Sequence, residues 1–131
     1  MTDPHHTRYL ANGLQCLRDE RWFDAHEEWE IPWKTMHGHV RWFWQAMIQL
    51  SVGAYHHSRG NRTGCRNLWH KARRRCRQVR DCPDLAHADM VDTLDALLAD
   101  CLAREARGAD PLSPIRDFAR RVVTPRWYDF R

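Results

Sequence analysis

Two side chains that could exchange a proton stand one helical turn apart in the segment 22–33. On a helix, His26 and Glu30 lie on the same face, and an imidazole beside a carboxylate is a general base with its orienting group. The same sector carries Trp29 and Trp33, large apolar side chains that normally face a core. Because an unpaired buried charge is costly, His26 and Glu30 are predicted to be buried and to pair with each other or with a neighbouring helix.

A second polar stripe follows in the segment 40–57. Gln45, Gln49 and His56 fall within about 40° of one another on an otherwise apolar helix. Helices joined by a short loop usually pack antiparallel, which would turn this stripe toward His26 and Glu30. The sequence therefore predicts a pocket between the second and third helices, walled by tryptophan. In it the two glutamines would donate hydrogen bonds to a polarised oxygen, and His56 would be a second imidazole.

Three kinds of chemistry fit this pocket. In the first, a small polar ligand is bound and is turned over by a hydrolase-type reaction, with His26 as general base and Glu30 orienting it. In the second, His26, Glu30 and His56 hold a divalent metal, although di-metal bundles repeat Glu-x-x-His and this chain has His-x-x-x-Glu once. In the third, the polar groups only satisfy one another and fix the helix packing.

The segment 59–80 is strongly basic. It holds nine Lys or Arg and no acid, whereas the whole chain has a formal charge of only +4, so the remainder is net acidic. Such a helix suits nucleic-acid phosphates, and the candidate contacts are Arg66, Arg73, Arg74 and Arg77. The alternative is the solvated face of an amphipathic helix, because an apolar stripe from Cys65 onward runs beneath the charges.

The elements that must position these residues are all helical. Apolar residues recur with helical spacing from Pro4 through Leu17, from about Trp22 to Pro32, at about 40–57, from Cys65 to Val79 and at about 88–107, and Ser113-Pro114 begins a short last helix. Pro32 should end the second helix, Gly60 the third, and Asn61 should cap the fourth. No repeat or linker is evident. The predicted fold is one all-α domain over residues 1–131, a compact bundle of about five helices with a short C-terminal helix.

Length and cysteine usage restrict the setting. No apolar run approaches the ~20 residues that cross a bilayer, and the N-terminus has no apolar signal core, so no membrane partner is expected. Five cysteines without a C-x-x-C pair favour a reducing, cytoplasmic compartment. A protein-interaction or homo-oligomeric module is a further function class, with Trp42, Trp44 and Trp127 covering the partner surface.

Several of these residues also form a family pattern. The run Phe23-Asp24-Ala25-His26-Glu27 with Glu30 and Trp33, then Arg41, Gln45-Ala46-Met47-Ile48-Gln49, Tyr55-His56, Gly60-Asn61, Gly64 and Leu68, resembles the Domain of Unknown Function 309 family. The resemblance covers about residues 22–68. It implies a small all-helical prokaryotic protein and implies no reaction.

Within that region, Glu27, Tyr55 and Asn61 join Trp29 and Trp33 as candidate ligand-binding residues. Two positions depart from the family pattern: Glu20 stands where a turn glycine is common, and Ala46 where a helix glycine is common.

Overall fold

Six helices form the part of the chain that the structure describes. The structure is a computed structural model, and it describes residues 4–80 and 88–122. Trp127, a predicted partner-surface residue, lies outside these residues. The helices are α1 Pro4–Arg18, α2 Trp22–Trp33, α3 His39–Ser58, α4 Arg62–Arg80, α5 Ala88–Ala106 and α6 Ser113–Arg121. The predicted all-α bundle is therefore confirmed.

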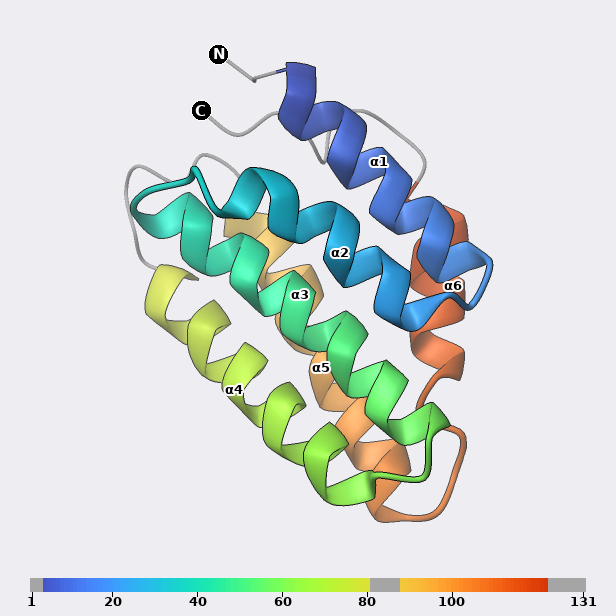
Figure 1. The fold of residues 1–131 in the computed structure, drawn as a ribbon. Helices are drawn as coiled ribbons and strands as arrows, with labels where there is room; N and C mark the ends of the chain where they lie inside the picture. Colours follow the sequence, from blue (N-terminus) through green and yellow to red (C-terminus); the bar gives the residue numbers. More distant parts are fainter. Residues whose placement is uncertain (1–3, 81–87, 123–131) are drawn as a thin grey trace.

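The helices pack in chain order into a closed ring. Each helix contacts the next one, and α6 returns to α1, while α5 lies behind α3 and α4 (Figure 1). Two polar contacts close the ring: Arg18 donates to the carbonyl of Ala119 (2.9 Å), and Arg116 pairs with Glu20 (2.6 Å). None of the helices described is long and apolar enough to cross a membrane.

The boundaries follow local chemistry. Pro32 is the penultimate residue of α2, and the helix ends at Trp33. Gly60, after α3, has a φ of 79°, which glycine adopts without a steric penalty. Asn61 then caps α4 as predicted, because its Oδ1 accepts the backbone N–H of Gly64 (2.9 Å). The short α3–α4 turn is thereby fixed.

A buried tryptophan sets the spacing of α3 and α4. Trp69 is fully buried, and its indole N–H donates to the carbonyl of Leu50 (3.0 Å). The ring lies over Gly53, where a Cβ would overlap the indole. The glycine therefore allows a close helix approach, and the hydrogen bond satisfies a donor that would otherwise be buried without a partner.

The same arrangement joins α1 and α2. Trp29 donates to the carbonyl of Leu10 (3.3 Å), and its ring covers Gly13, where a Cβ would again overlap the indole. All three residue numbers are 40 lower than those of the α3–α4 set. The expectation of no repeat is therefore wrong: the chain contains two helical hairpins with the pattern Leu-x-x-Gly followed by Trp sixteen residues after the glycine.

The two hairpin turns also correspond. The backbone N–H of Arg21 donates to the carbonyl of Cys16 (2.8 Å), as that of Asn61 does to the carbonyl of His56 (2.8 Å). Glu20 has a φ of 58°, in the place that Gly60 occupies in the second hairpin. A glutamate there carries a steric penalty that glycine does not, which explains why a glycine is the commoner choice for such a turn.

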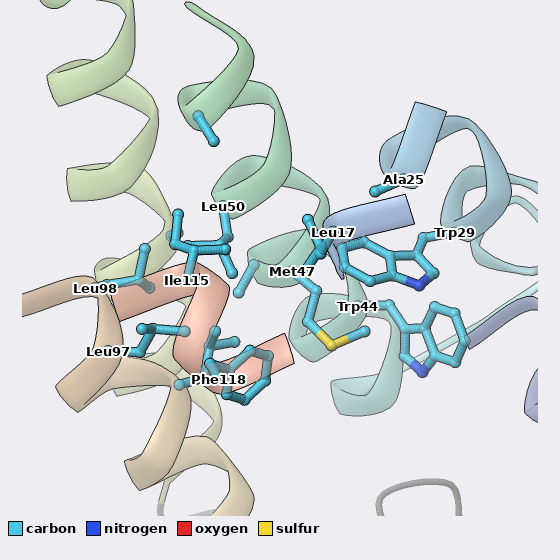
Figure 2. Close-up of a cluster of buried hydrophobic side chains, with 14 of the residues drawn as sticks. Leu17, Ala25, Trp29, Trp44, Met47, Leu50, Leu97, Leu98, Ile115 and Phe118 are labelled. Carbon is cyan, nitrogen blue, oxygen red and sulfur yellow. The ribbon is translucent and has the colours of Figure 1, made fainter. Parts of the chain in front are cut away.

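A single apolar core fills the ring. Its side chains come from α1, α2, α3, α5 and α6, with Met47 and Leu50 of α3 near its centre (Figure 2). Residues of α4, including Cys76, extend it. The core therefore holds both hairpins and the two C-terminal helices together.

The glycine–tryptophan contact gives a stability prediction. We expect Gly53→Ala to lower the free energy of unfolding by about 1–3 kcal/mol, because the added methyl group displaces the Trp69 ring. In the double variant with Trp69→Phe the smaller ring leaves room for the methyl, so the loss is smaller than the sum of the two single losses. Urea unfolding of the four proteins measures this coupling, and strictly additive losses would contradict the contact.

Candidate functional site

His26 and Glu30 form the predicted pair. Nε2 of His26 lies 3.4 Å from Oε2 of Glu30. Nδ1 of His26 contacts the carbonyl oxygen of Phe23, one turn earlier. Because a carbonyl only accepts, the single proton of a neutral His26 lies on Nδ1, which leaves Nε2 as its acceptor; an imidazolium would in addition direct an Nε2–H at the Glu30 carboxylate. The His26 side chain is 14% exposed and Glu30 is 38% exposed, so the pair lies at the surface rather than in the predicted buried pocket.

A row of four rings crosses from α2 to α3 at this place. Phe23 contacts His26 in a T-shaped arrangement (ring centroids 4.4 Å apart) and Tyr55 of α3 in a tilted one (4.9 Å), and Tyr55 is 6.1 Å from His56. Phe23 is 42% exposed, although it is a large apolar side chain. The row thus offers solvent an aromatic surface with an imidazole at each end.

His56 is held in the opposite tautomer to His26. Oδ1 of Asn61 is engaged by the N–H of Gly64, which fixes the orientation of the Asn61 amide. Its Nδ2 therefore points to Nδ1 of His56, 3.4 Å away, and an amide nitrogen only donates. In neutral His56, Nδ1 accepts and Nε2 carries the proton. The row consequently has a proton acceptor at His26 and a donor at His56.

The predicted glutamines do not join this pair. Gln49 lies on the other side of α3, in a groove formed with α4 residues. Gln45 is partly buried, and none of the hydrogen bonds within residues 4–80 and 88–122 links it to His26 or Glu30. The periodicity places the two glutamines on one sector of α3 correctly, but that sector lies toward α4 and solvent.

The two tryptophans predicted to wall the pocket, Trp29 and Trp33, make other contacts. Trp29 is 1% exposed and its indole is directed to Leu10 of α1, so its ring belongs to the hairpin contact. Trp33 is covered by the guanidinium of Arg41, 4.1 Å above its ring. Trp44 is 1% exposed, which excludes it from a partner surface. The aromatic surface beside His26 comes instead from Phe23, whose exposure the sequence does not reveal.

The metal set is not assembled. Within the described residues, no three His, Cys, Asp or Glu side chains gather closely enough to hold a metal ion. His26 and Glu30 are in contact, but the contacts of His56 go to Tyr55 and Asn61. Glu27 is exposed and lines a groove on α2 together with Glu28, Glu30, Ile31 and Lys34.

Two of the four predicted nucleic-acid contacts, Arg66 and Arg73, form ion pairs with buried acids of α5. Arg66 and Arg62 both bind the carboxylate of Glu105 (2.9 and 2.8 Å), which is 2% exposed. Arg73 and Arg80 likewise bind Asp95 (both 2.8 Å), which is 8% exposed. Arg66 and Arg73 are therefore the partners of buried α5 acids.

Two residues that sequence reasoning passed over, Asp95 and Glu105, thus account for much of the basic helix. Burial by itself would raise the pKa of each carboxyl, but the hydrogen bonds and charges of the arginines outweigh it and hold both pKa values below their ordinary range. The signal available in the sequence was the set of acidic positions in 88–107, the segment that follows the strongly basic helix.

The remaining basic residues of α4 lie on the side of α3. Lys71, Arg74 and Arg75 line a groove of about 280 Å³ together with Gln49 and Gln78. Arg77 is exposed and is not part of that groove. Of the four predicted phosphate contacts, only Arg74 lies in this groove.

The comparisons with known proteins bear on the first four helices. Residues 10–68 match the family model described as Domain of unknown function (DUF309). The match begins at Leu10 and ends within α4, so it starts twelve residues earlier than the resemblance at 22–68 and includes most of both hairpins. Neither the curated proteins nor the solved structures gave a match.

The two histidine tautomers are directly measurable. At a pH where both imidazoles are neutral, side-chain ¹⁵N NMR should show His26 protonated on Nδ1 and His56 protonated on Nε2. Asn61→Ala removes the amide that fixes His56, so only the His56 signal should shift toward a mixture of tautomers. An Nε2-protonated His26 would contradict the contact with the Phe23 carbonyl.

The buried acids of α5 predict that the free energy of unfolding decreases at acidic pH. Their pKa values are lower in the folded than in the unfolded state, so their stabilisation is complete above the ordinary carboxyl range, at about pH 5, and is lost as pH falls through the folded-state values. We expect Asp95→Asn to be less stable at neutral pH and to depend less on pH below 4 in thermal unfolding. Asp100→Asn, at an exposed position of the same helix, is the control and should keep the wild-type slope.

Proposed function

We propose that the surface between α2 and α3 binds a small polar ligand through His26, Glu30 and His56. The observation that carries the proposal is the pair of opposite tautomers at the ends of one aromatic row. A ligand with one donor and one acceptor would satisfy both imidazoles. Its planar or apolar part would rest on Phe23, whose exposed ring otherwise contacts water.

The repeat supports a functional rather than a structural role for the pair. The second hairpin has the same glycine–tryptophan contact and the same turn, but Arg66 and His70 stand where the first has His26 and Glu30. Arg66 pairs with Glu105, and His70 is exposed. Because a hairpin of this geometry forms without an imidazole and a carboxylate at these positions, packing alone does not account for them.

Binding is favoured over turnover. If the ligand reacts, Nε2 of His26 would accept a proton and Glu30 would stabilise the imidazolium, as in a hydrolase-type general base. A polarised oxygen would need donors in place of Gln45 and Gln49. The row offers two such donors, the N–H on Nε2 of neutral His56 and the hydroxyl of Tyr55.

A reducing, cytoplasmic compartment remains our proposal for the setting. Cys16, Cys65, Cys76 and Cys101 are buried free thiols. Burial raises the pKa of Cys65 and of Cys76 to about 12, which keeps these thiols protonated and unreactive at neutral pH.

The ligand proposal is tested with a defined set of fragments. Small amides, carboxylic acids and phosphate monoesters are screened against the protein by ligand-observed NMR. We expect fragments that bind the wild type at millimolar affinity to bind at least tenfold more weakly to His26→Ala and to Phe23→Ala, because each change removes one half of the site. His70→Ala removes an exposed histidine from the second hairpin and should leave binding unchanged.

Two results would overturn the proposal. One is a fragment set that binds the wild type and His26→Ala equally. The other is an absence of binding together with a His26→Ala melting temperature lowered by several degrees, since the pair would then be a packing element. His26→Gln keeps a polar side chain of similar length and separates the role of packing from that of the imidazole.

A further inference from the structure

The basic residues of α4 divide into two sides with different partners. Arg62, Arg66, Arg73 and Arg80 face α5 and are neutralised by its acids. On the side of α3, Lys71 and Arg74 make no ion pair with any residue in the described ranges, and Arg75 hydrogen bonds only to the uncharged Gln78 (2.9 Å). No acid lines their groove within the described part of the chain. Three positive charges on this side are therefore available to an external anion.

An exposed indole adjoins these charges. The guanidinium of Arg75, which lines the groove, lies over the Trp42 ring at 5.7 Å from its centroid, so the indole is a neighbour of the groove through Arg75. Trp42 is 37% exposed, whereas Trp29, Trp44 and Trp69 are at most 1% exposed. A flat aromatic surface next to a row of cations can stack a base while the cations contact phosphates.

One of the residues that line the groove carries an unsatisfied acceptor. Oε1 of Gln49 is buried, and no donor in the described part of the chain reaches it. A buried acceptor without a partner costs free energy, which a ligand N–H would recover. Exocyclic amino groups of bases are donors of this kind.

We propose that the groove between α3 and α4, with Trp42 at its edge, binds single-stranded nucleic acid. Lys71, Arg74 and Arg75 contact successive phosphates, Trp42 stacks a base, and Gln49 accepts from a base N–H. An acidic peptide would use the cations but not the indole. A duplex would hide its base faces from Trp42, so the exposed ring favours a single strand.

This proposal differs from the basic-helix prediction in its contacts. The sequence alone offered Arg66, Arg73, Arg74 and Arg77, but the structure assigns the first two to α5 and leaves Arg77 outside the groove. It is also independent of the His26 site, which lies on the α2 side of α3.

Binding of a fluorescein-labelled 12-nucleotide single-stranded RNA, followed by anisotropy over a salt series, tests the proposal. Lys71→Gln/Arg74→Gln should weaken binding and lower the magnitude of the log K against log salt slope by about 1.4, which is about 0.7 for each phosphate that is no longer neutralised. The control, Arg59→Gln/Arg77→Gln, removes the same charge from exposed positions outside the groove and should change the slope by less than half as much. Trp42→Ala should weaken binding about tenfold or more with the slope unchanged.

Each other outcome rejects the proposal. If the two double variants change RNA affinity and the salt slope equally, the RNA binds a diffuse basic surface and not the groove. An unaffected Trp42→Ala, with poly-glutamate competing as well as unlabelled RNA, means an acidic protein partner instead. A wild-type dissociation constant for the RNA above about 1 μM at low salt, the order of magnitude of non-specific binding, contradicts the proposed site. Thermal melting of each variant confirms that it is folded, and His26→Ala should bind RNA like the wild type.

Discussion

The hydrogen bond from a buried indole to a helix carbonyl, made over a glycine, is the constraint on which both hairpins depend. It requires a glycine three residues after the acceptor, because any side chain there would occupy the space of the ring. It also fixes the rotation of each helix about its axis, since the glycine must face the tryptophan. Once Gly53 faces α4, Tyr55 must lie on the α2 side, where it meets Phe23. The aromatic row is thus a consequence of the second hairpin's packing.

Using the same contact twice leaves the outward positions of each hairpin free to diverge. In the first hairpin these positions carry His26 and Glu30, and in the second they carry Arg66, which neutralises Glu105 of α5, and the exposed His70. The charged side chains of each hairpin therefore depend on which helices that hairpin packs against. The second hairpin must bury Asp95 and Glu105 against it, and a buried carboxylate requires a paired cation. The first hairpin has no such neighbour among the described residues and can keep an imidazole–carboxylate pair at the surface.

The helices could be predicted well from the sequence because interactions between residues close in the chain determine where each helix ends. Proline, glycine and Asn61 act within a few residues, and His26 and Glu30 meet because four residues make one turn. Which neighbouring helix a polar stripe faces is determined by tertiary packing and not by residues close in sequence. Gln49 and His56 share a sector of α3, but whether that sector faces α2 or α4 depends on where Gly53 must point. Trp29 was misplaced for the same reason, since its partner is a carbonyl nineteen residues earlier.

The central position of α3 explains why two unlike surfaces occur in so small a chain. With α2 on one side and α4 on the other, α3 contributes Tyr55 to one seam and Gln49 to the other. The first seam combines an imidazole with acids of α2, and the second combines amides with cations of α4. A polyanion is repelled by the first and attracted by the second, so the two seams select ligands of different charge without interfering. The modest net charge of the chain conceals this separation, because the acids of α2 cancel the cations on the α3 side of α4 in the sum but not in space.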